Sequence, residues 1–234
     1  MSPKPDLERT VRLAARALSR HGLVHAYGHC SARLDEAHFL VCAPRPMGLI
    51  EPGEAGTVVA IDAPLPEGVL GEVRIHQQIY RARPEVGGVA RFMSPKAMSL
   101  AATGRVPQPR HAFGAYVAGT ALWEDAQLVR DDDRARGVAA TMGAAPAILL
   151  RGNGVVTAGA TLEEAVVLAW YLEEACRVEL DVLAAGLVDE PPTYTLETAA
   201  TRATKAGLIF ERMWEFLTAG DPESGVTRAG KNAA

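Results

Sequence analysis

The sequence has few cysteines and no long apolar run. Its three cysteines are Cys30, Cys42 and Cys176. Thiols so few and so scattered exclude a disulfide framework and a four-cysteine zinc site, and we expect each to be reduced. No apolar stretch approaches the roughly 20 residues that a membrane-spanning helix needs. The first ten residues, MSPKPDLERT, lack the apolar segment of a signal peptide, so the sequence predicts a cytoplasmic protein.

The sequence also lacks an excess of charge of one sign. It has 24 basic and 28 acidic residues, interspersed, for a net charge of −4. Because nucleic acids and anionic membranes are bound by clustered basic residues, we expect neither as a partner. The length of 234 residues, 48% of them hydrophobic, suffices for one sizeable core. We expect a single domain over residues 1–220 and a disordered polar tail over 221–234.

Local patterns predict both helices and strands. Segments with apolar residues at helical spacing predict helices over residues 6–22, 72–83 and 161–185. The last begins at Thr161, whose hydroxyl caps the helix while Glu164 reaches back in a capping box. Short apolar runs bounded by glycine or proline predict strands over residues 39–43, 57–61, 88–93, 147–150 and 155–157. The last two flank a hairpin turn at 151–154, whereas 28–31 are expected to form a loop. Together they predict an α/β domain with a mixed sheet.

Three blocks of sequence carry a family resemblance. In chain order they read HGLVHAYGHCSARL, GEVRIHQQIYRARPEVGGV and ILLRGNGVVTAGATLEEAVVLAWYLEEACR. Over about residues 7–187 the chain resembles class II aldolase and adducin proteins. The resemblance implies a three-layer αβα domain around a central, largely antiparallel sheet, commonly assembled as a tetramer with active sites between subunits. It also implies the activities of that family, which include sugar-phosphate aldolases, epimerases and decarboxylases.

The positions that bind a metal ion in those enzymes are altered here. The resemblance implies three histidine ligands for zinc or a similar ion, and the matching residues are Arg91, Met93 and Asn153. A guanidinium has no lone pair for a metal and carries a permanent positive charge. Methionine suits soft metals, and one asparagine oxygen cannot complete a zinc site. We therefore expect no metal ion and no other cofactor.

Three residues are predicted to do chemistry. Glu72 matches the family's acid/base glutamate and begins a predicted helix, whose dipole favours the ionised carboxylate. Arg91 places a cation where the family has its metal, and together with the Asn153 amide it could stabilise an enolate. Alternatively, Glu72 only caps the helix, Arg91 pairs with it in an inactive site, and Asn153 serves the hairpin turn. The resemblance implies that His111 is close to the position at which relatives have a tyrosine or histidine that transfers protons to or from the substrate. The ordinary pKa of a histidine, about 6.5, suits that role.

The expected substrate contacts include the remnant of a phosphate-binding loop. Gly28 matches the family, but His29 occupies a position at which relatives frequently have asparagine. Leu70 and Gly71 occupy two positions that carry hydroxyl groups in the family, and residues 43–46 replace a small polar segment. Few neutral donors remain for a phosphate, so we do not expect a phosphosugar substrate. The predicted substrate-binding residues are His25, Gly28, His29, Arg45, Met93 and Asn153.

These observations predict a metal-independent lyase or isomerase. It would act on a small carbonyl or carboxylate metabolite by enolate-type acid/base chemistry, such as aldol cleavage, decarboxylation, dehydration or cyclisation, with Glu72, Arg91 and His111 as catalytic residues. Two alternatives stay open. One is a non-catalytic binding or assembly protein of the adducin-head type. The other is a metal site rebuilt from His25, His29, His76 and Glu72. We expect a homo-oligomer, a tetramer as in the family.

Overall fold

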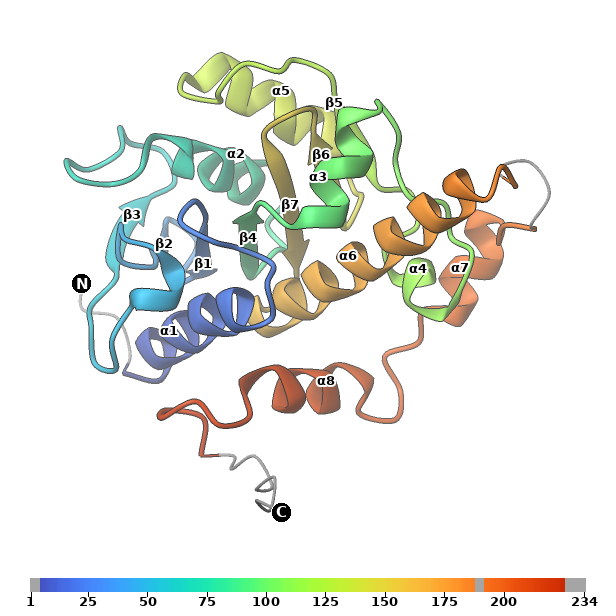
Figure 1. The fold of residues 1–234 in the computed structure, drawn as a ribbon. Helices are drawn as coiled ribbons and strands as arrows, with labels where there is room; N and C mark the ends of the chain where they lie inside the picture. Colours follow the sequence, from blue (N-terminus) through green and yellow to red (C-terminus); the bar gives the residue numbers. More distant parts are fainter. Residues whose placement is uncertain (1–4, 188–191, 226–234) are drawn as a thin grey trace.

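The computed structural model describes residues 5–187 and 192–225, and within them seven strands form one sheet (Figure 1). The strands are β1 (His29–Arg33), β2 (His38–Val41), β3 (Thr57–Ala60), β4 (Gly88–Phe92), β5 (Ala121–Trp123), β6 (Ala147–Leu150) and β7 (Gly154–Gly159). Their order across the sheet is β3-β2-β1-β4-β7-β6-β5. Neighbouring strands run antiparallel, except that β5 and β6 are parallel. The predicted mixed, largely antiparallel sheet is confirmed.

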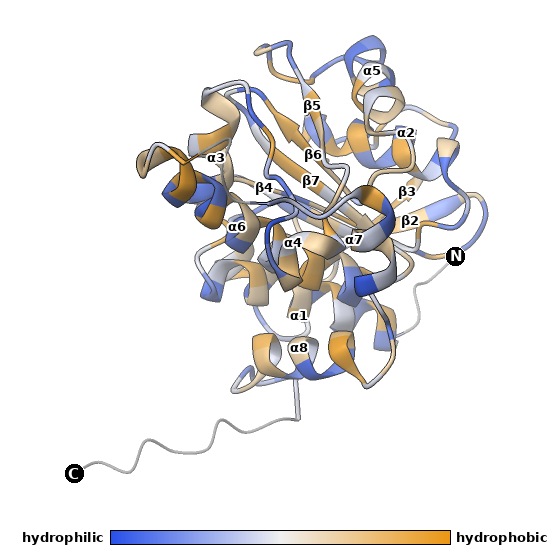
Figure 2. Cartoon of the chain, turned by 90° about the vertical axis from the view of Figure 1, so that its right-hand side faces the viewer, coloured by the Kyte–Doolittle hydropathy of each residue, from blue (hydrophilic) through white to orange (hydrophobic). Residues whose placement is uncertain are grey.

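Helices cover both faces of the sheet. One face carries α2 (Arg74–Ala82) and α5 (Asp132–Met142). The other side carries α1 (Pro5–Arg20), α3 (Pro95–Ala102), α4 (Ala112–Tyr116), α6 (Leu162–Ala184), α7 (Leu196–Arg202) and α8 (Ile209–Thr218). Along β6, Ile148 packs in the cluster under α2 and α5 while Leu149 packs in the cluster under α6, as the two-residue period of a strand requires. Figure 2 shows these apolar strands between the two helical layers, which confirms the three-layer architecture.

The predicted capping box of α6 forms only in part. The Thr161 hydroxyl accepts a hydrogen bond from the Glu164 backbone N–H at 3.1 Å, as predicted. The Glu164 carboxylate does not reach back to residue 161, because it accepts bonds from the Lys205 ammonium at 2.7 and 2.8 Å. The predicted hairpin is confirmed as β6, β7 and the turn between them.

The predicted loop at residues 28–31 is wrong, because His29–Arg33 form β1 near the middle of the sheet. Cys30 and Ala32 face the cluster under α1 and α6, whereas His29 and Ser31 contact residues of α2 on the opposite face. A strand with small and polar residues lacks the apolar run by which the other strands were predicted. Its pairing with β2 and β4 comes from tertiary structure.

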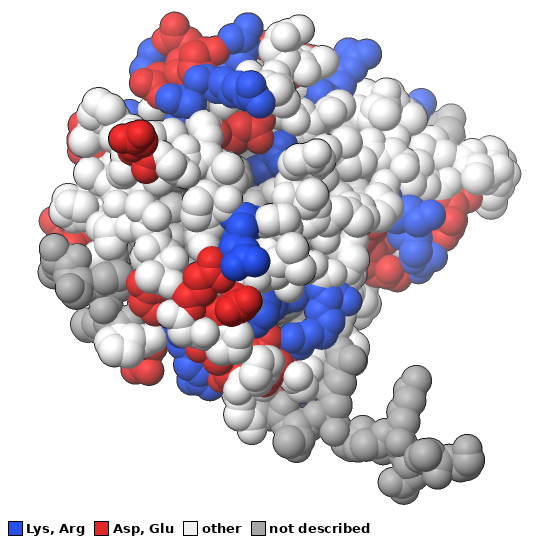
Figure 3. Space-filling view, turned by 60° about the vertical axis from the view of Figure 1, so that its left-hand side comes forward, with Lys and Arg blue, Asp and Glu red and all other residues white. Residues whose placement is uncertain are grey.

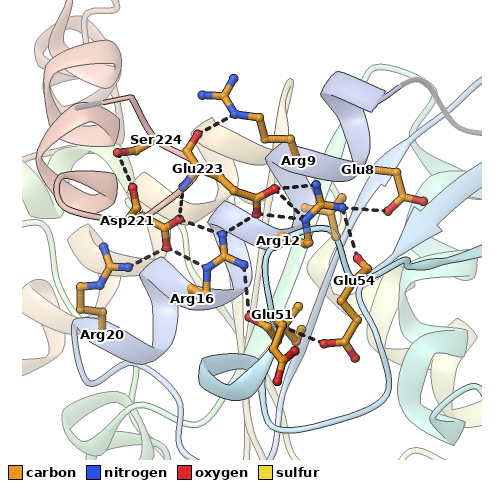
Figure 4. A network of polar contacts seen from close by, with 12 residues as sticks. Glu8, Arg9, Arg12, Arg16, Arg20, Glu51, Glu54, Asp221, Glu223 and Ser224 are labelled. Carbon is orange, nitrogen blue, oxygen red and sulfur yellow. Dashed lines mark hydrogen bonds and ion pairs between the residues drawn. The ribbon is translucent and has the colours of Figure 1, made fainter. Parts of the chain in front are cut away.

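The C-terminal segment is anchored where a disordered tail was expected to begin. Asp221 is 5% exposed, and its carboxylate accepts hydrogen bonds from Arg16 at 2.8 and 2.7 Å and from Arg20 at 2.6 Å (Figure 4). Glu223 pairs with Arg12 at 2.7 Å and with Arg16 at 2.7 Å. The predicted tail therefore starts too early, because its carboxylates complement arginines spaced four residues apart on α1. Its remainder, residues 226–234, lies outside the described residues.

The surface charges are interspersed and the cysteines are free, as the composition predicts. Acidic and basic side chains lie side by side on the face drawn in Figure 3. The three cysteines are free and buried. Among the described residues, no helix combines the length and the apolar character that crossing a bilayer requires.

Candidate functional site

Three residues that lie far apart in the sequence meet at one end of the sheet. Arg91 is near the end of β4, Asn153 is in the turn between β6 and β7, and Glu72 is in the 3-10 turn η2 (Gly71–Val73) before α2. Arg91 lies opposite Val156 in the β4–β7 ladder, so the turn comes beside the end of β4. The antiparallel pairing of β1 with β2 and β4 brings the loops before β1 and after β2 to the same end.

The turn that holds Asn153 depends on glycine. Gly152 and Gly154 have φ angles of +73° and +98°, a region that side-chain-bearing residues rarely adopt. A Cβ atom on Gly154 would also lie 2.5 Å from the carbonyl oxygen of Phe92. The turn therefore packs directly on the β4 backbone, close enough for the Asn153 side chain to reach the β4 residue Arg91.

Glu72, Arg91 and Asn153 form a closed triangle of contacts. Arg91 Nη2 lies 2.7 Å from Glu72 Oε2 and donates to the Asn153 backbone oxygen at 2.8 Å and to its Oδ1 at 3.1 Å. Asn153 Nδ2 donates to Glu72 Oε1 at 2.8 Å. The Arg91 side chain is 4% exposed and that of Glu72 is 15% exposed. The triangle is thus a nearly buried cation held by a carboxylate and an amide, with the carboxylate partly open to solvent.

The Arg91 guanidinium keeps its charge in this setting. Burial lowers the pKa of Arg91, and the Glu72 carboxylate beside it opposes that shift. A guanidinium remains protonated at any pH at which proteins fold. Its Nε–H is buried and has no hydrogen-bond partner among the described residues. The site therefore offers a permanent positive charge and a buried donor that no described residue uses.

These residues do not fit a divalent metal ion. The Arg91 guanidinium and the Asn153 amide already hold the Glu72 carboxylate, and a cation repels a second cation. Met93, half-buried next to the turn, adds only a thioether. Residues 5–187 and 192–225 also contain no group of three or more His, Cys, Asp and Glu side chains placed to hold an ion, so the rebuilt metal site is not formed.

A second, fully buried polar cluster links β1 to α2. His29 Nδ1 lies 2.8 Å from His76 Nε2, and Ser31 Oγ lies 2.6 Å from His76 Nδ1. Ser31 Oγ also lies 2.9 Å from the Tyr80 hydroxyl. Burial, followed by the charge of Arg91, lowers the pKa of His76 to about 3. Burial, His76 and Arg91 likewise lower the pKa of His29 well below its ordinary value, so both imidazoles are neutral.

Sequence reasoning missed this cluster. His76 and Tyr80 lie four residues apart on the predicted helix, and His29 and Ser31 lie two apart on β1, so each pair shares one face. The first spacing was visible in the sequence. The second spacing places two side chains on one face only within a strand, and the sequence predicts a loop at residues 28–31.

The other predicted substrate contacts are not part of the triangle of Glu72, Arg91 and Asn153. His25 is exposed, and Arg45 is exposed and paired with Glu54 at 3.2 Å. Gly28 is a packing position, because a Cβ there would lie 2.9 Å from the Arg91 carbonyl oxygen and 2.5 Å from Val24 Cγ2.

His111 lies apart from the triangle within one chain. It immediately precedes α4, its ring contacts that of Phe113, and the charged residues that act on it are Glu174 and Arg177 of α6. Burial lowers the pKa of His111, Glu174 opposes the shift and Arg177 adds to it. Figures 1 and 2 both show α4 away from α2, against α6 and α7. The structure therefore does not bring His111 to Glu72 and Arg91 of the same chain.

Comparison with known proteins assigns the family. Residues 9–180 match the family described as class II aldolase and adducin N-terminal domain, so the chain belongs to this family. It is 31% identical over 193 residues to 3,4-dihydroxyphthalate decarboxylase of Terrabacter sp. (strain DBF63), covering 74% of this chain and 80% of that protein. It is 31% identical over 199 residues to the decarboxylase of the same name from Arthrobacter keyseri, covering 75% and 78%. L-fuculose 1-phosphate aldolase from Glaciozyma antarctica PI12 shares the fold, with a TM-score of 0.74 at 22% identity over 90% of this chain and 88% of that one. Family and relatives support a lyase-type enzyme.

Proposed function

We propose that this protein is a metal-independent lyase for a small carbonyl or carboxylate metabolite, with decarboxylation as its most direct reaction. The observation that carries the proposal is the buried Arg91 cation, held by Glu72 and Asn153. By the family resemblance, Arg91 and Asn153 occupy positions of metal ligands. The decarboxylase relatives favour loss of CO₂ over the other enolate reactions. A preorganised charge in a nearly dry site stabilises a developing oxyanion without reorganising solvent.

In the proposed reaction, the bond between the substrate carbon and its carboxylate breaks, and CO₂ leaves. The electron pair of that bond moves to the neighbouring carbonyl oxygen, which becomes an enolate oxyanion. Arg91 stabilises this negative charge through its free Nε–H and its positive charge. Glu72, whose carboxylate is partly exposed, takes a proton from solvent and delivers it to the carbon. The balance is one proton consumed and one CO₂ released.

We further propose that the chain forms a homotetramer and that His111 completes the site of a neighbouring subunit. His111 lies away from Glu72 of its own chain, and its Nε2 is buried without a hydrogen-bond partner among the described residues. Large apolar side chains that would be covered by such an assembly are exposed, and they include Tyr27, Leu49 and Phe216. Met93, His25 and Arg45 are proposed to contact the remainder of the substrate from the same end of the sheet.

The proposal is tested by combining chelation with a screen for CO₂ release. Purified protein is treated with EDTA, dialysed, analysed for metals, and assayed on a panel of 2-hydroxy and 2-oxo carboxylates and hydroxylated benzoates. We expect no stoichiometric zinc, manganese or iron, and turnover that is the same before and after EDTA. Turnover that disappears with EDTA and returns with a divalent ion would overturn the metal-independent assignment.

A further inference from the structure

The buried cluster between β1 and α2 is a chain of four hydrogen bonds with a defined direction. At its inner end, the Tyr80 hydroxyl donates to the Ser31 backbone oxygen at 3.0 Å. The chain then runs through Ser31 Oγ and both ring nitrogens of His76 to His29 Nδ1. His76 is 0% exposed and Tyr80 is 1% exposed, so solvent does not supply alternative partners. Burial raises the pKa of Tyr80, which keeps its proton.

Counting protons favours one direction for each bond. Tyr80, Ser31 and the two neutral imidazoles each carry one proton, and four contacts need four protons. With the Tyr80 proton on the Ser31 carbonyl, all four contacts are filled only when the Ser31 hydroxyl donates to Tyr80 and accepts from His76 Nδ1–H. His76 Nε2 is then an acceptor, and His29 Nδ1–H donates to it. In the reverse direction, Tyr80 would donate to Ser31 Oγ, and Ser31 would donate to His76. Only three contacts would then hold a proton, and the Tyr80 hydroxyl oxygen and the Ser31 backbone oxygen would lie 3.0 Å apart without a proton between them.

This direction leaves His29 Nε2 as a bare lone pair. That atom is buried and has no hydrogen-bond partner among the described residues. His29 lines a cavity of about 10 Å³ whose walls are mostly apolar and include Val41, Val69, Leu70 and Val73. Such a cavity has room for about one water molecule or one hydroxyl group of a ligand. The residue that carries this acceptor therefore lines a space that fits a single O–H group.

The neighbour of this acceptor is an unused donor. His29 lies directly opposite Arg91 in the β1–β4 ladder, so their side chains stand together on one face of the sheet. Arg91 Nε–H is also buried without a partner among the described residues. A lone-pair acceptor and a cationic donor thus lie on neighbouring strands, and the cation is paired with the Glu72 carboxylate.

We propose that His29 is a specificity-determining residue whose Nε2 accepts a hydrogen bond from a substrate hydroxyl group, while Arg91 binds an adjacent oxyanion. The substrate class is a compound with a hydroxyl group next to a carboxylate or carbonyl oxygen, such as an ortho-hydroxy aromatic acid or a 2-hydroxy carbonyl compound. A bare lone pair repels a second acceptor, so a phosphate or a methyl ether is rejected at His29. This inference rests on the proposed function for the presence of a substrate at the triangle, but the state of His29 does not depend on turnover.

The direction of the chain is tested first, without any substrate. Protein labelled with ¹⁵N-histidine is studied by NMR through the long-range couplings of the ring nitrogens, which distinguish the Nδ1–H tautomer from the Nε2–H tautomer. We expect His29 and His76 both to be neutral and to carry the proton on Nδ1. A proton on Nε2 of His29 would overturn the inference, even for an active enzyme.

Ligand selectivity is the second test, with salicylate, benzoate and 2-methoxybenzoate as probes in calorimetric titrations. We expect the wild type to bind salicylate about tenfold more tightly than the other two, because only salicylate donates to His29. His29→Phe should remove this preference by lowering the affinity for salicylate to that for benzoate, whereas His38→Asn, at the opposite end of β2, should retain it. Equal affinity of the wild type for all three probes would overturn the assignment. Salicylate selectivity without CO₂ release from any compound would refute the proposed reaction and leave the role of His29 intact.

Tyr80→Phe provides a readout that a purely structural role would not change. Without the Tyr80 hydroxyl, the Ser31 proton has His76 Nδ1 as its remaining partner, so the chain reverses and His29 Nε2 becomes a donor. We expect the variant to show the Nε2–H tautomer and to bind 2-methoxybenzoate better than salicylate. A folded variant that keeps the Nδ1–H tautomer and the salicylate preference would show that the chain does not control His29. Ser31→Ala, which uncouples His76 from Tyr80, replaces Tyr80→Phe if the latter fails to fold.

Discussion

Replacing Arg91 with methionine separates the catalytic role of this residue from its structural role. The substitution removes the 2.7 Å ion pair with Glu72 and both hydrogen bonds to Asn153, while keeping an unbranched side chain of similar length. Under the proposed function, turnover should fall by about 10²–10³-fold, the usual cost of removing a preorganised charge from an oxyanion. Arg91→Lys should fail too, because an ammonium cannot reproduce the guanidinium geometry.

The stability cost follows from what remains around Glu72. Breaking a buried ion pair from one side costs about 3–5 kcal/mol. Here the Glu72 side chain is 15% exposed and still accepts from Asn153 Nδ2 at 2.8 Å, so we expect the lower part of that range, about 3 kcal/mol. For a domain of this size, that corresponds to a fall in melting temperature of about 6–12 °C.

The double variant Arg91→Met, Glu72→Gln decides between the roles. It removes both charges, so the melting temperature should return most of the way to that of the wild type, whereas turnover should stay lost. Melting curves by circular dichroism and CO₂ release are measured on the same preparations. Arg91→Met protein that melts lower but reacts at the wild-type rate would refute the catalytic reasoning. An unchanged melting temperature would contradict the ion pair with Glu72.

Three further predictions concern other parts of the molecule. Arginines of α1 lower the pKa of Glu223 to about 2 and also, against burial, that of Asp221; these groups therefore stabilise the fold above about pH 4.5 and lose that effect as the pH falls toward 2. In the double variant Asp221→Asn, Glu223→Gln, the melting temperature should fall less steeply between pH 6 and pH 2 than in the wild type. An equally steep fall in both proteins would contradict the assignment. Co-expressed Glu72→Gln and His111→Asn chains should recover activity that neither variant has alone, because some sites then combine an intact Glu72 with an intact His111 of a neighbour; no recovery in verified mixed oligomers would refute that arrangement. Gly154→Ala should lower the melting temperature, since its φ is +98° and the new Cβ would meet the Phe92 carbonyl, whereas Gly104→Ala, with a φ of +71° and open space around it, should cost less.

The predictable part of the fold was encoded in local patterns. Thr161 caps α6 because its hydroxyl lies within reach of the next turn, and the glycines at 152 and 154 supply the positive φ angles of the hairpin turn. Each of these features depends on residues within a few positions of one another. The resemblance implied metal ligands at the positions of Arg91, Met93 and Asn153, and the prediction that these residues hold no zinc needed only their residue types, because the chemistry of a ligand resides in the residue type.

Contacts between segments that lie far apart in the sequence were determined only by the tertiary structure. The sequence left open whether Arg91 pairs with Glu72 or stands alone, and the β4–β7 register brings the two together through Asn153. It suggested a tail from residue 221, whereas the arginines of α1 hold that segment through an ion-pair network that has no local signature.

The placement of the histidines depended most on tertiary structure. His111 immediately precedes α4, away from the triangle of its own chain, although the resemblance suggested that it would reach the pocket. The proposed direction of the hydrogen-bond chain to His29 rests on the bond from the Tyr80 hydroxyl to a carbonyl of β1, 49 residues away in the sequence. Propensity and periodicity act over a few residues, whereas strand register and buried hydrogen bonds are determined only when the whole sheet closes on its helices.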